Sequence, residues 1–391
     1  MDVETVRELR TERGSRLLAE VAAHGTDPGT LLATVTALRR SHPADLVNAA
    51  VTQVRLRERA RAKFGPVADR MFFTPDGLEQ ATRASVAAHR ARRYADTDRV
   101  LDLCCGVGGD LVALAGAGLR VRGVDHNPVA LEVARANAEV LGLADRIELA
   151  CGDVTAEPLD GWAAAFCDPA RRGGGRRVFD PAAYSPPFAF LATLAATVPA
   201  TGAKVAPGIP HELVPDGVEA EWVSDSGAVK EAALWWPALA TARRRATLLP
   251  GGHTLTSTGA EIGAGPVGRY LYEPDGAVIR AGLVAETAAL LDGRLLDPTI
   301  AYVTTDRLGH TPFATGYTIT DVLPFSLKRL RALLRARGVG SLTVKKRGSA
   351  IEPETLRRDL RLSGSERATV VLTRLAGAPT VLLVEPLATC H

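Results

Sequence analysis

Hydrophobic and polar residues alternate with a helical period through the first ~95 positions. Apolar residues recur every three or four positions at 31–40 and again at 46–64. A further helix is predicted after Thr74, because threonine is a suitable N-cap and Pro75 suits the first helical position. The chain therefore begins with an N-terminal helical region, which we place at residues 1–95.

From Arg99 the pattern changes to short apolar runs that alternate with helical segments. Asn127 is positioned to cap one of these helices, since Pro128 follows it directly. Alternating strands and helices are typical of a parallel, doubly wound α/β sheet, which we expect over residues 96–250. Five strands are predicted from RVLDLCC (99–105), LRVRGVD (119–125), RIELACGD (146–153), AAAFCDP (163–169) and AKVAPGI (203–209), with later runs adding the last strands and an antiparallel pair.

The C-terminal third divides into two parts. Residues 251–316 form a connecting segment rich in Gly, Pro and Thr, with short strands predicted at GRYLYE (268–273) and AVIRA (277–281) and a helix at LVAETAALLD (283–292). Residues 317–391 form a small α/β domain. In that domain Ser326 caps a basic helix, and three apolar runs predict strands.

The composition favours a cytoplasmic protein without membrane or metal. The N-terminus is charged from residue 2, and no run reaches the ~18 apolar residues that a membrane span needs. Five cysteines form no C-x-x-C pair, so neither a disulfide framework nor a zinc site is predicted. Buried free thiols in a reducing compartment are the expected arrangement.

Charge is unevenly distributed along the chain. The net charge is +3 overall, but +4 over residues 1–99, −8 over 100–317 and +7 over 318–391. Basic ends around an acidic centre indicate a polyanionic partner. A genome composition that favours Arg is the alternative, because 41 of the 47 basic residues are Arg.

A glycine-rich loop closes the first predicted strand and opens a helix. It reads DLCCGVGGD, from Asp102 through Gly106 and Gly108 to Asp110. Glycines at such a place allow a tight turn and a close approach of the backbone to a ligand. Leu111 stands where the dinucleotide fingerprint needs glycine, and no P-loop Lys-Ser/Thr follows, so nicotinamide, flavin and nucleoside triphosphate enzymes are disfavoured.

Carboxylates follow the next three strands. Asp125 can accept both hydroxyls of a ribose, and Asp153 can accept the exocyclic amine of an adenine. Asp168 ends the fourth strand. Each aspartate alone is as easily a turn or cap residue, but four strand-end carboxylates beside one glycine loop fit an adenosine ligand without a pyrophosphate.

These motifs, DLCCGVGGD, VRGVDHNP, ACGDV and CDPA, resemble those of class I S-adenosylmethionine-dependent methyltransferases. The stretch 134–153 resembles the trimethylguanosine-synthase-like branch. The resemblance implies a seven-stranded sheet and S-adenosyl-L-methionine as cofactor. The C-terminal end resembles a THUMP-like domain of bacterial enzymes, which implies an RNA substrate.

The resemblance also implies roles for individual residues. Asp102, Gly106 and Gly108 would hold the methionine part, with Thr74 closing over its carboxylate, and Asp110 belongs to the same set. The ribose and adenine would be bound by Asp125, His126, Asn127, Asp153 and Val154. Asp168 and Pro169 would face the methyl acceptor.

The acceptor loop departs from the Pro-Pro-aromatic pattern of amine-methylating enzymes, since it reads Asp168-Pro169-Ala170-Arg171. Arg171 can stack on a base or bind phosphate, which gives it a catalytic role in our interpretation. Phe179 and Tyr184 are alternative sources of the missing ring, or ordinary core residues. RRGGGRR (171–177) and the basic residues of 328–348 suit an RNA backbone, or are simply solvated.

The sequence therefore predicts methylation of a base in RNA, tRNA or rRNA, with the exocyclic amine of guanine favoured. Two alternatives stay open: a small-molecule or protein methyltransferase, and a non-catalytic module that binds cofactor and RNA. Cys167 is interpreted as a buried strand residue rather than as the nucleophile that C5 methylation of pyrimidines needs. The sequence leaves the oligomeric state open.

Overall fold

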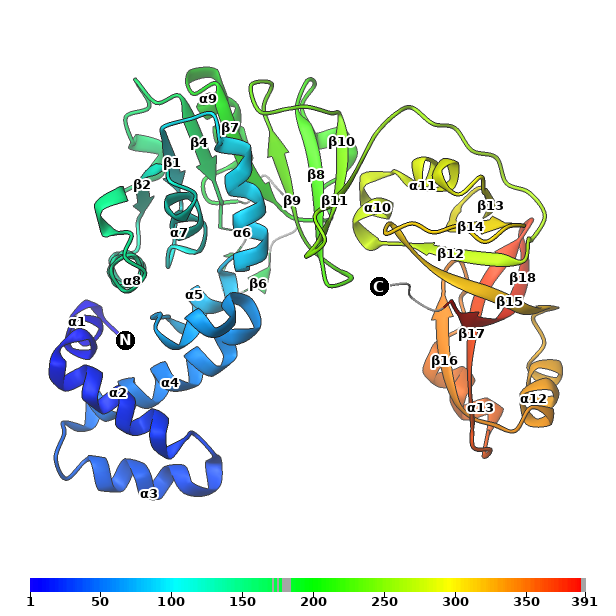
Figure 1. The fold of residues 1–391 in the computed structure, drawn as a ribbon, viewed down its shortest axis with the longest axis horizontal. Helices are drawn as coiled ribbons and strands as arrows, with labels where there is room; N and C mark the ends of the chain where they lie inside the picture. The colour runs from blue at the N-terminus through cyan, green and yellow to red at the C-terminus, as the bar shows by residue number, and fades with distance from the viewer. Residues whose placement is uncertain (171, 174–175, 178–183, 388–391) are drawn as a thin grey trace. The chain divides into compact units, whose positions relative to one another are not determined.

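A computed structural model describes residues 1–170, 172–173, 176–177 and 184–387 of the 391-residue chain. Contacts divide the chain into two compact units, whose elements are labelled in Figure 1. Unit 1 comprises Met1–Ala220 and Glu231–Thr241, and unit 2 comprises Glu221–Lys230 and Ala242–His391. The domain boundaries proposed from sequence, after residues 95, 250 and 316, stay predictions.

Four helices build the N-terminal part of unit 1. Side-chain oxygens of Asp2, Thr11 and Asp27 cap the first three by accepting hydrogen bonds from backbone N–H groups of the first turn. The helical periodicity of this region is thus confirmed. The helices are α1 (Val3–Arg10), α2 (Glu12–His24), α3 (Pro28–Leu38) and α4 (Ala44–Phe64).

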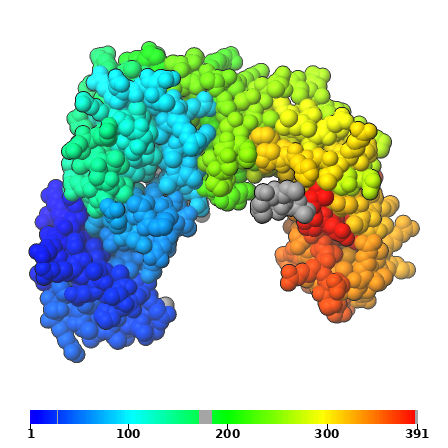
Figure 2. Space-filling view, viewed as in Figure 1, coloured from blue at the N-terminus to red at the C-terminus, as the bar shows by residue number. Residues whose placement is uncertain are grey.

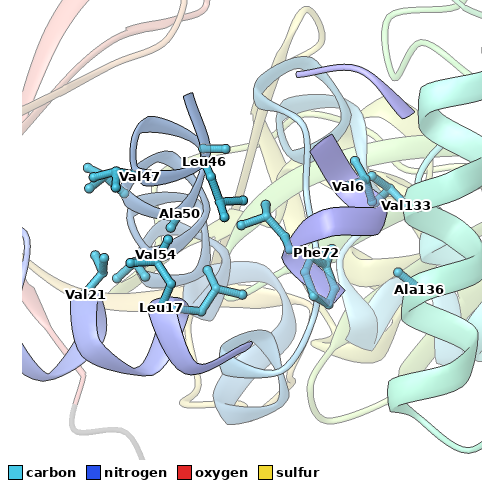
Figure 3. Close-up of a cluster of buried hydrophobic side chains, with 14 of the residues drawn as sticks. Val6, Leu17, Val21, Leu46, Val47, Ala50, Val54, Phe72, Val133 and Ala136 are labelled. Carbon is cyan, nitrogen blue, oxygen red and sulfur yellow. The ribbon is translucent and has the colours of Figure 1, made fainter. Parts of the chain in front are cut away.

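A buried apolar cluster joins these helices to the rest of unit 1 (Figure 3). It draws side chains from α1, α2, α4, the segment before α5, the glycine loop and α8 (Pro128–Val140). In Figure 2 the blue N-terminal helices and the teal residues near α8 form one continuous surface. Each fully buried Val, Leu or Phe contributes about 1.5–3 kcal/mol, so the docking of the helices is substantial. The cluster includes Val6, Leu17, Val21, Leu46, Val47, Ala50, Val54, Phe72, Val107, Val133 and Ala136.

Short helices lead from α4 into the sheet. Thr74 begins one of them as predicted, because its Oγ1 accepts a hydrogen bond of 2.9 Å from the backbone N–H of Gly77. These elements are η1 (Gly65–Asp69), α5 (Pro75–Gln80), α6 (Ala84–Ala91) and η2 (Arg92–Tyr94).

Parallel strands occupy the centre of unit 1. β1 (Arg99–Leu103) pairs in parallel with β2 (Arg120–Asp125) and β4 (Ala164–Cys167). These pair in turn with β3 (Ile147–Cys151) and β7 (Ala200–Val205), and β9 (Ala228–Trp235) is antiparallel to β7. The order of these six is β3-β2-β1-β4-β7-β9, in a sheet of nine strands rather than the predicted seven. The doubly wound α/β class is confirmed.

Helices follow the first two strands. α7 (Gly109–Gly116) comes after β1, and α8 comes after β2 with Asn127 as its cap, as predicted. Leu111 and Leu114 of α7 pack in the core with Val100 and Val121 of the sheet. The remaining elements of unit 1 are η3 (Ala144–Arg146), η4 (Val154–Ala156), β5 (Arg172–Gly173), β6 (Arg176–Arg177), α9 (Phe188–Thr197) and η6 (His211–Leu213).

Unit 2 contains a sheet of seven strands in the order β13-β14-β12-β15-β18-β17-β16. It also holds an antiparallel pair of β10 (Arg244–Leu249) and β11 (His253–Thr256), and most of β8 (Glu219–Asp225). The sheet strands are β12 (Tyr270–Pro274), β13 (Arg294–Asp297), β14 (Ile300–Thr305), β15 (Ala314–Pro324), β16 (Val339–Lys346), β17 (Glu366–Leu375) and β18 (Ala378–Pro386). The helices are α10 (Gly276–Ala281), α11 (Val284–Leu290), α12 (Leu327–Ala336) and α13 (Pro353–Leu360).

One predicted strand of unit 2 is wrong. AVIRA forms most of α10, because Asp275 caps the segment by accepting a 2.7 Å hydrogen bond from the N–H of Ala277. Gly282, at a φ of +67°, then ends the helix in the left-handed conformation. Ser326 caps α12 as predicted. No helix among the described residues has both the length and the apolar character that crossing a bilayer requires.

Candidate active site

A cavity of about 1010 Å³ lies in unit 1, where the carboxyl ends of β1, β2 and β4 meet. Open parallel sheets bind ligands at this edge. Its walls come from the segment 74–82, the glycine loop and the loops after β2 and β4. Nine of the predicted site residues line it: Thr74, Asp102, Gly106, Asp110, Asp125, His126, Asn127, Asp168 and Pro169.

Asp102 is an unpartnered buried carboxylate in this cavity. Its side chain is 1% exposed, and neither oxygen has a hydrogen-bond partner among the described residues. Burial, followed by the negative charge of Asp168, raises the pKa of Asp102 to about 8. A buried charge without a partner is costly, so the ionised form of this carboxylate would be stabilised by a cationic group in the cavity.

Asp125 ties the loops after β1 and β2 together. Its Oδ2 accepts a hydrogen bond of 2.9 Å from the N–H of Gly106, and its Oδ1 accepts one of 2.8 Å from the N–H of Asn127. Gly106 and Gly108 have φ angles of +54° and +87°, which only glycine adopts readily. The glycines therefore shape the loop that Asp125 holds, and each carboxylate oxygen still has a lone pair for a ligand hydroxyl.

Asp110 lines the cavity but is occupied by internal partners. Its Oδ2 accepts a 2.7 Å hydrogen bond from Thr82 Oγ1, and its Oδ1 is paired with Arg90. Arg90 is buried, reaches Glu231 with its other nitrogen and lies 4.2 Å from the centre of the Phe166 ring. These contacts indicate that Asp110 fixes the wall of the cavity.

The sequence analysis missed Lys204. This residue of β7 is buried, lines the cavity, and places its Nζ 2.6 Å from Asp168 Oδ2 and 3.2 Å from Thr82 Oγ1. Asp168 is itself held at the end of β4, where its N–H donates to the carbonyl of Leu103 at 3.1 Å. The sequence did contain an indication of this contact, namely a single lysine inside the apolar run AKVAPGI. A lysine in a buried strand needs an acidic partner nearby.

Two buried amides hold the chain just before Thr74. Gln53 of α4 donates to the Phe73 carbonyl at 2.6 Å and accepts from the Phe73 N–H at 3.0 Å. Asn137 of α8 binds Phe72 in the same way, at 3.1 and 2.7 Å, and also donates to the carbonyl of Val107 in the glycine loop at 3.0 Å. The N-terminal helices thereby fix one wall of the cavity, which sequence reasoning did not foresee.

Three other predicted site residues, Gly108, Asp153 and Val154, lie outside the lining of the cavity. Asp153 is exposed, and its carboxylate accepts hydrogen bonds from the N–H and hydroxyl of Thr155, which lower its pKa. Val154 is buried and begins η4, and Gly108 precedes α7. Arg171 lies outside the described residues.

Two aromatic residues had been considered for the acceptor site. Tyr184 is buried, and its hydroxyl accepts a 3.2 Å hydrogen bond from the N–H of Ala206, so it serves packing. Phe179 lies outside the described residues. Of RRGGGRR, the structure describes only the short antiparallel pair of β5 and β6.

The basic cluster of unit 2 is largely paired within the unit. Lys345 and Arg347 lie 2.6 and 3.6 Å from carboxylate oxygens of Glu273, and Lys346 lies 2.6 Å from Glu352. Their charge is thus partly compensated. Within the described part of the chain, His, Cys, Asp and Glu form no group of three that could hold a metal ion.

Thiols near the cavity are poorly ionised. A hydrogen bond with Cys167, followed by burial, raises the pKa of Cys104, and burial raises the pKa of Cys105. Cys167 itself is fully buried in β4. Thiolate is the nucleophilic form of cysteine, so these side chains suit packing better than attack on a substrate.

Three parts of the chain match known family models. Residues 97–188 match the family model of RNA cap guanine-N2 methyltransferases, and residues 314–386 match a THUMP domain-like model. Residues 2–60 match a domain of unknown function. The crystal structure of a protein assigned as a methyltransferase from Porphyromonas gingivalis W83 has the same fold, with a TM-score of 0.73 over 89% of this chain and 92% of that chain. The two sequences are 22% identical.

Relatives in sequence give the family. The chain is 40% identical over 333 residues to uncharacterised S-adenosylmethionine-dependent methyltransferases from two strains of Mycobacterium tuberculosis, covering 82% of this chain and 90% of each relative. A 23S rRNA (uracil(1939)-C(5))-methyltransferase from Cupriavidus metallidurans is 38% identical over 118 residues, 27% of this chain and 25% of that protein. The chain belongs to the S-adenosylmethionine-dependent methyltransferases.

S-adenosylmethionine is accordingly the cofactor. The residues of the cavity fit it, since the unpartnered Asp102 carboxylate meets the need of a ligand that carries an ammonium group and a sulfonium. Asp125 has acceptor capacity for two vicinal hydroxyls of a ribose.

Proposed function

We propose that this enzyme methylates an exocyclic amine of a base in RNA, with the amine of guanine favoured and tRNA or rRNA as the carrier. One observation carries the proposal: a single cavity holds two carboxylates in contrasting states. Asp102 is buried without a partner, whereas Asp168 is neutralised by Lys204. The first suits a cationic cofactor, and the second suits a neutral acceptor group.

In this proposal the glycine loop and the ends of β1 to β3 bind the cofactor. Asp102 accepts hydrogen bonds from its ammonium group, and Asp125 accepts those of the ribose hydroxyls, with His126 and Asn127 beside it. Thr74 covers the methionine carboxylate from the segment that Gln53 and Asn137 hold. Asp153 and Val154, which follow β3, complete the adenine side.

Support for an RNA acceptor comes from the matched families. The model over residues 97–188 describes RNA cap guanine-N2 methyltransferases, and the one over 314–386 describes THUMP-like domains. The Cupriavidus relative acts on 23S rRNA by its name. In unit 2, Lys328 and Arg329 at the start of α12 are exposed and available to a phosphate backbone.

Orientation is the main task of the acceptor residues. When bound, S-adenosylmethionine supplies a methyl group on a positively charged sulfur, so the leaving group is already built in. The transfer forms an N–C bond, breaks the S–C bond and leaves a neutral thioether, while the nitrogen releases one proton to solvent. A base amine is a weak nucleophile because its lone pair is delocalised, and Asp168 can align it by accepting one of its hydrogens.

Methylation of uracil at C5 is the reaction of the Cupriavidus relative, and it is less well supported for this chain. That chemistry needs a cysteine nucleophile at the acceptor. The thiols of Cys104 and Cys105 have raised pKa values and Cys167 is fully buried, while the exposed Cys151 is not among the residues that line the cavity.

The test is to incubate the enzyme with radiolabelled S-adenosylmethionine and total RNA from a strain that lacks it. We expect label that ribonuclease releases, and N2-methylguanosine as the labelled nucleoside in mass spectrometry. Asp168→Ala should keep its affinity for S-adenosylhomocysteine and lose at least about 100-fold in transfer.

Other outcomes point to the alternatives. Label that survives ribonuclease indicates a protein or small-molecule acceptor. Cofactor binding without transfer to any acceptor indicates a binding module. Transfer by Asp168→Ala at the normal rate would show that the acceptor site has been misplaced.

A further inference from the structure

Lys204 is a buried cation that lies outside the sequence motifs and outside the ranges matched by the family models, 2–60, 97–188 and 314–386. It lies on β7, next to β4 in the sheet, and its side chain is 7% exposed. Its ammonium group has three protons, and the described residues supply two acceptors, Asp168 Oδ2 at 2.6 Å and Thr82 Oγ1 at 3.2 Å. The residue is therefore directed at the acceptor loop.

We propose that Lys204 is a positioning residue of the acceptor site, which binds Asp168 Oδ2 and thereby leaves Oδ1 to accept a hydrogen from the nucleophilic amine. This inference rests on the proposed function, because it assumes that the acceptor binds at Asp168. The described residues supply no donor to Oδ1. When a hydrogen bond fixes one oxygen of a carboxylate, the orientation of the lone pairs on the other oxygen is also set.

The surroundings explain why the carboxylate needs this partner. Asp102 and Asp125 also line the cavity, so Asp168 stands among like charges. The positive charge of Lys204 offsets the negative charge of Asp168. It also lowers the pKa of Asp102, which burial and the charge of Asp168 raise.

The position of the lysine is fixed from both sides. Thr82 accepts from Lys204 and donates to Asp110, which Arg90 binds from the other side. On the acceptor side, Ala170 exchanges two backbone hydrogen bonds with Ser185, at 2.8 and 3.0 Å, so the chain directly after Asp168 and Pro169 is held as well. Because Lys204 is itself held in place, it can determine the position of the Asp168 carboxylate.

The arrangement defines the class of acceptor. Oδ1 can align by a hydrogen bond only a nucleophile that bears a polar hydrogen, such as the exocyclic amine of guanine, adenine or cytosine. C5 of uracil bears only a C–H, so this nucleophilic atom has no donor for the oxygen. Lys204 thus favours amine methylation over the carbon methylation named for the Cupriavidus relative.

The test compares Lys204→Met, Lys204→Arg, Asp168→Asn and the double variant Lys204→Met/Asp168→Asn, on RNA from the deletion strain. We expect Lys204→Met to lower kcat about 100-fold, since a small misplacement of a reacting group has effects of this size. Its affinity for S-adenosylhomocysteine, measured by calorimetry, should stay within about threefold of the wild type. Lys204→Arg should recover most of the activity, because arginine can also bind Oδ2.

The double variant separates positioning from general damage. If Lys204 acts through Asp168, the double variant should be no slower than Asp168→Asn alone. Lys63→Met is the control, because Lys63 is a partly buried lysine of unit 1 that donates to the backbone carbonyls of Leu78, Glu79 and Ala81 and not to Asp168. Because Lys63 does not act through Asp168, the combined variant Lys63→Met/Asp168→Asn should lose kcat by the product of the two single fold-reductions.

Failure of this inference and failure of the proposed function look different. A wild-type enzyme that labels no RNA would overturn both. A wild type that labels RNA, together with a Lys204→Met variant of normal kcat or a double variant slower than Asp168→Asn, would overturn only the role of Lys204. Label found in 5-methyluridine would also overturn the inference while leaving RNA as the substrate.

Discussion

Gln53 and Phe73 exchange two hydrogen bonds, of 2.6 and 3.0 Å, that connect helix α4 to the segment lining the cofactor cavity. The Gln53 side chain is fully buried, so water cannot replace these bonds. A function of the N-terminal helices follows from this contact. They hold Thr74 and the residues after it in place against the glycine loop.

Replacement of Gln53 by leucine should therefore affect both stability and cofactor binding. The Phe73 N–H and carbonyl would lose their partners, at a cost of about 1–3 kcal/mol for each unsatisfied group. We expect a lower midpoint in urea and weaker binding of S-adenosylhomocysteine in calorimetry. Asn48→Leu on the exposed side of α4 is the control, and it should leave both measurements nearly unchanged. Equal effects of the two variants would contradict the role of Gln53.

Asp102 should make the stability of the ligand-free enzyme depend on pH. Its pKa is raised from 3.8 to about 8 in the folded protein, so the folded chain keeps a proton that the unfolded chain releases. The stabilisation from this proton is complete below about pH 4 and is lost as the pH rises through about 8. We expect the free energy of unfolding to fall over this window relative to Asp102→Asn. A constant difference between the two proteins would contradict the raised pKa.

Cofactor binding should depend on pH in the opposite direction. A cationic ligand needs the ionised form of Asp102, so binding releases a proton at neutral pH. The affinity for S-adenosylhomocysteine should rise between about pH 6 and 8 in the wild type. In Asp102→Asn it should be weaker and flat across the same range. Calorimetry in buffers of different ionisation enthalpy measures the released proton directly.

Arg90 should be among the most sensitive positions for folding. It is buried between Asp110 and Glu231, and Arg90→Met would leave both carboxylates without their cation. Breaking a buried ion pair in this way costs about 3–5 kcal/mol. Arg61→Met is the control, since Arg61 pairs with Asp69 on the surface. We expect a large shift of the denaturation midpoint for Arg90→Met and almost none for the control.

Gly108 should be intolerant of a side chain. Its φ of +87° is unfavourable for other residues by about 1–2 kcal/mol, and a methyl group there would lie 3.3 Å from the Cβ of Ala134. Gly108→Ala should lower the melting temperature and weaken cofactor binding. Gly116→Ala, inside α7 with open space around it, should instead stabilise the protein slightly. The opposite signs of the two changes make the comparison decisive.

The sequence alone predicted the central fold and most of the cavity. The apolar runs ending at Asp102, Asp125 and Asp168 define parallel strands, and such strands bring their carboxyl ends to one edge. Asn127 and Thr74 cap helices as predicted, because a cap is a local property of the chain. Asp153 was predicted to end a strand, but β3 ends at Cys151 and Asp153 caps η4, where its carboxylate binds Thr155 outside the lining of the cavity.

The missed features depend on contacts between distant segments. Gln53 and Phe73 are 20 residues apart, and Lys204 and Asp168 are 36 apart, so no periodic pattern reveals either pair. The strand predicted at 277–281 failed for a different reason. Its branched residues favour a strand, but Asp275 and Gly282 supply the two ends of a helix, and these local signals prevail.

The contact between α1 and α8 has a consequence for how the N-terminal part of unit 1 unfolds. Arg10 donates to Glu132 and pairs with Glu139, so a charge on the first helix is matched by charges more than a hundred residues later. Removal of the first sixty residues would break these ion pairs and the Gln53 contact at once. The leading helices and α8 should therefore exchange their amide hydrogens with solvent as one cooperative unit.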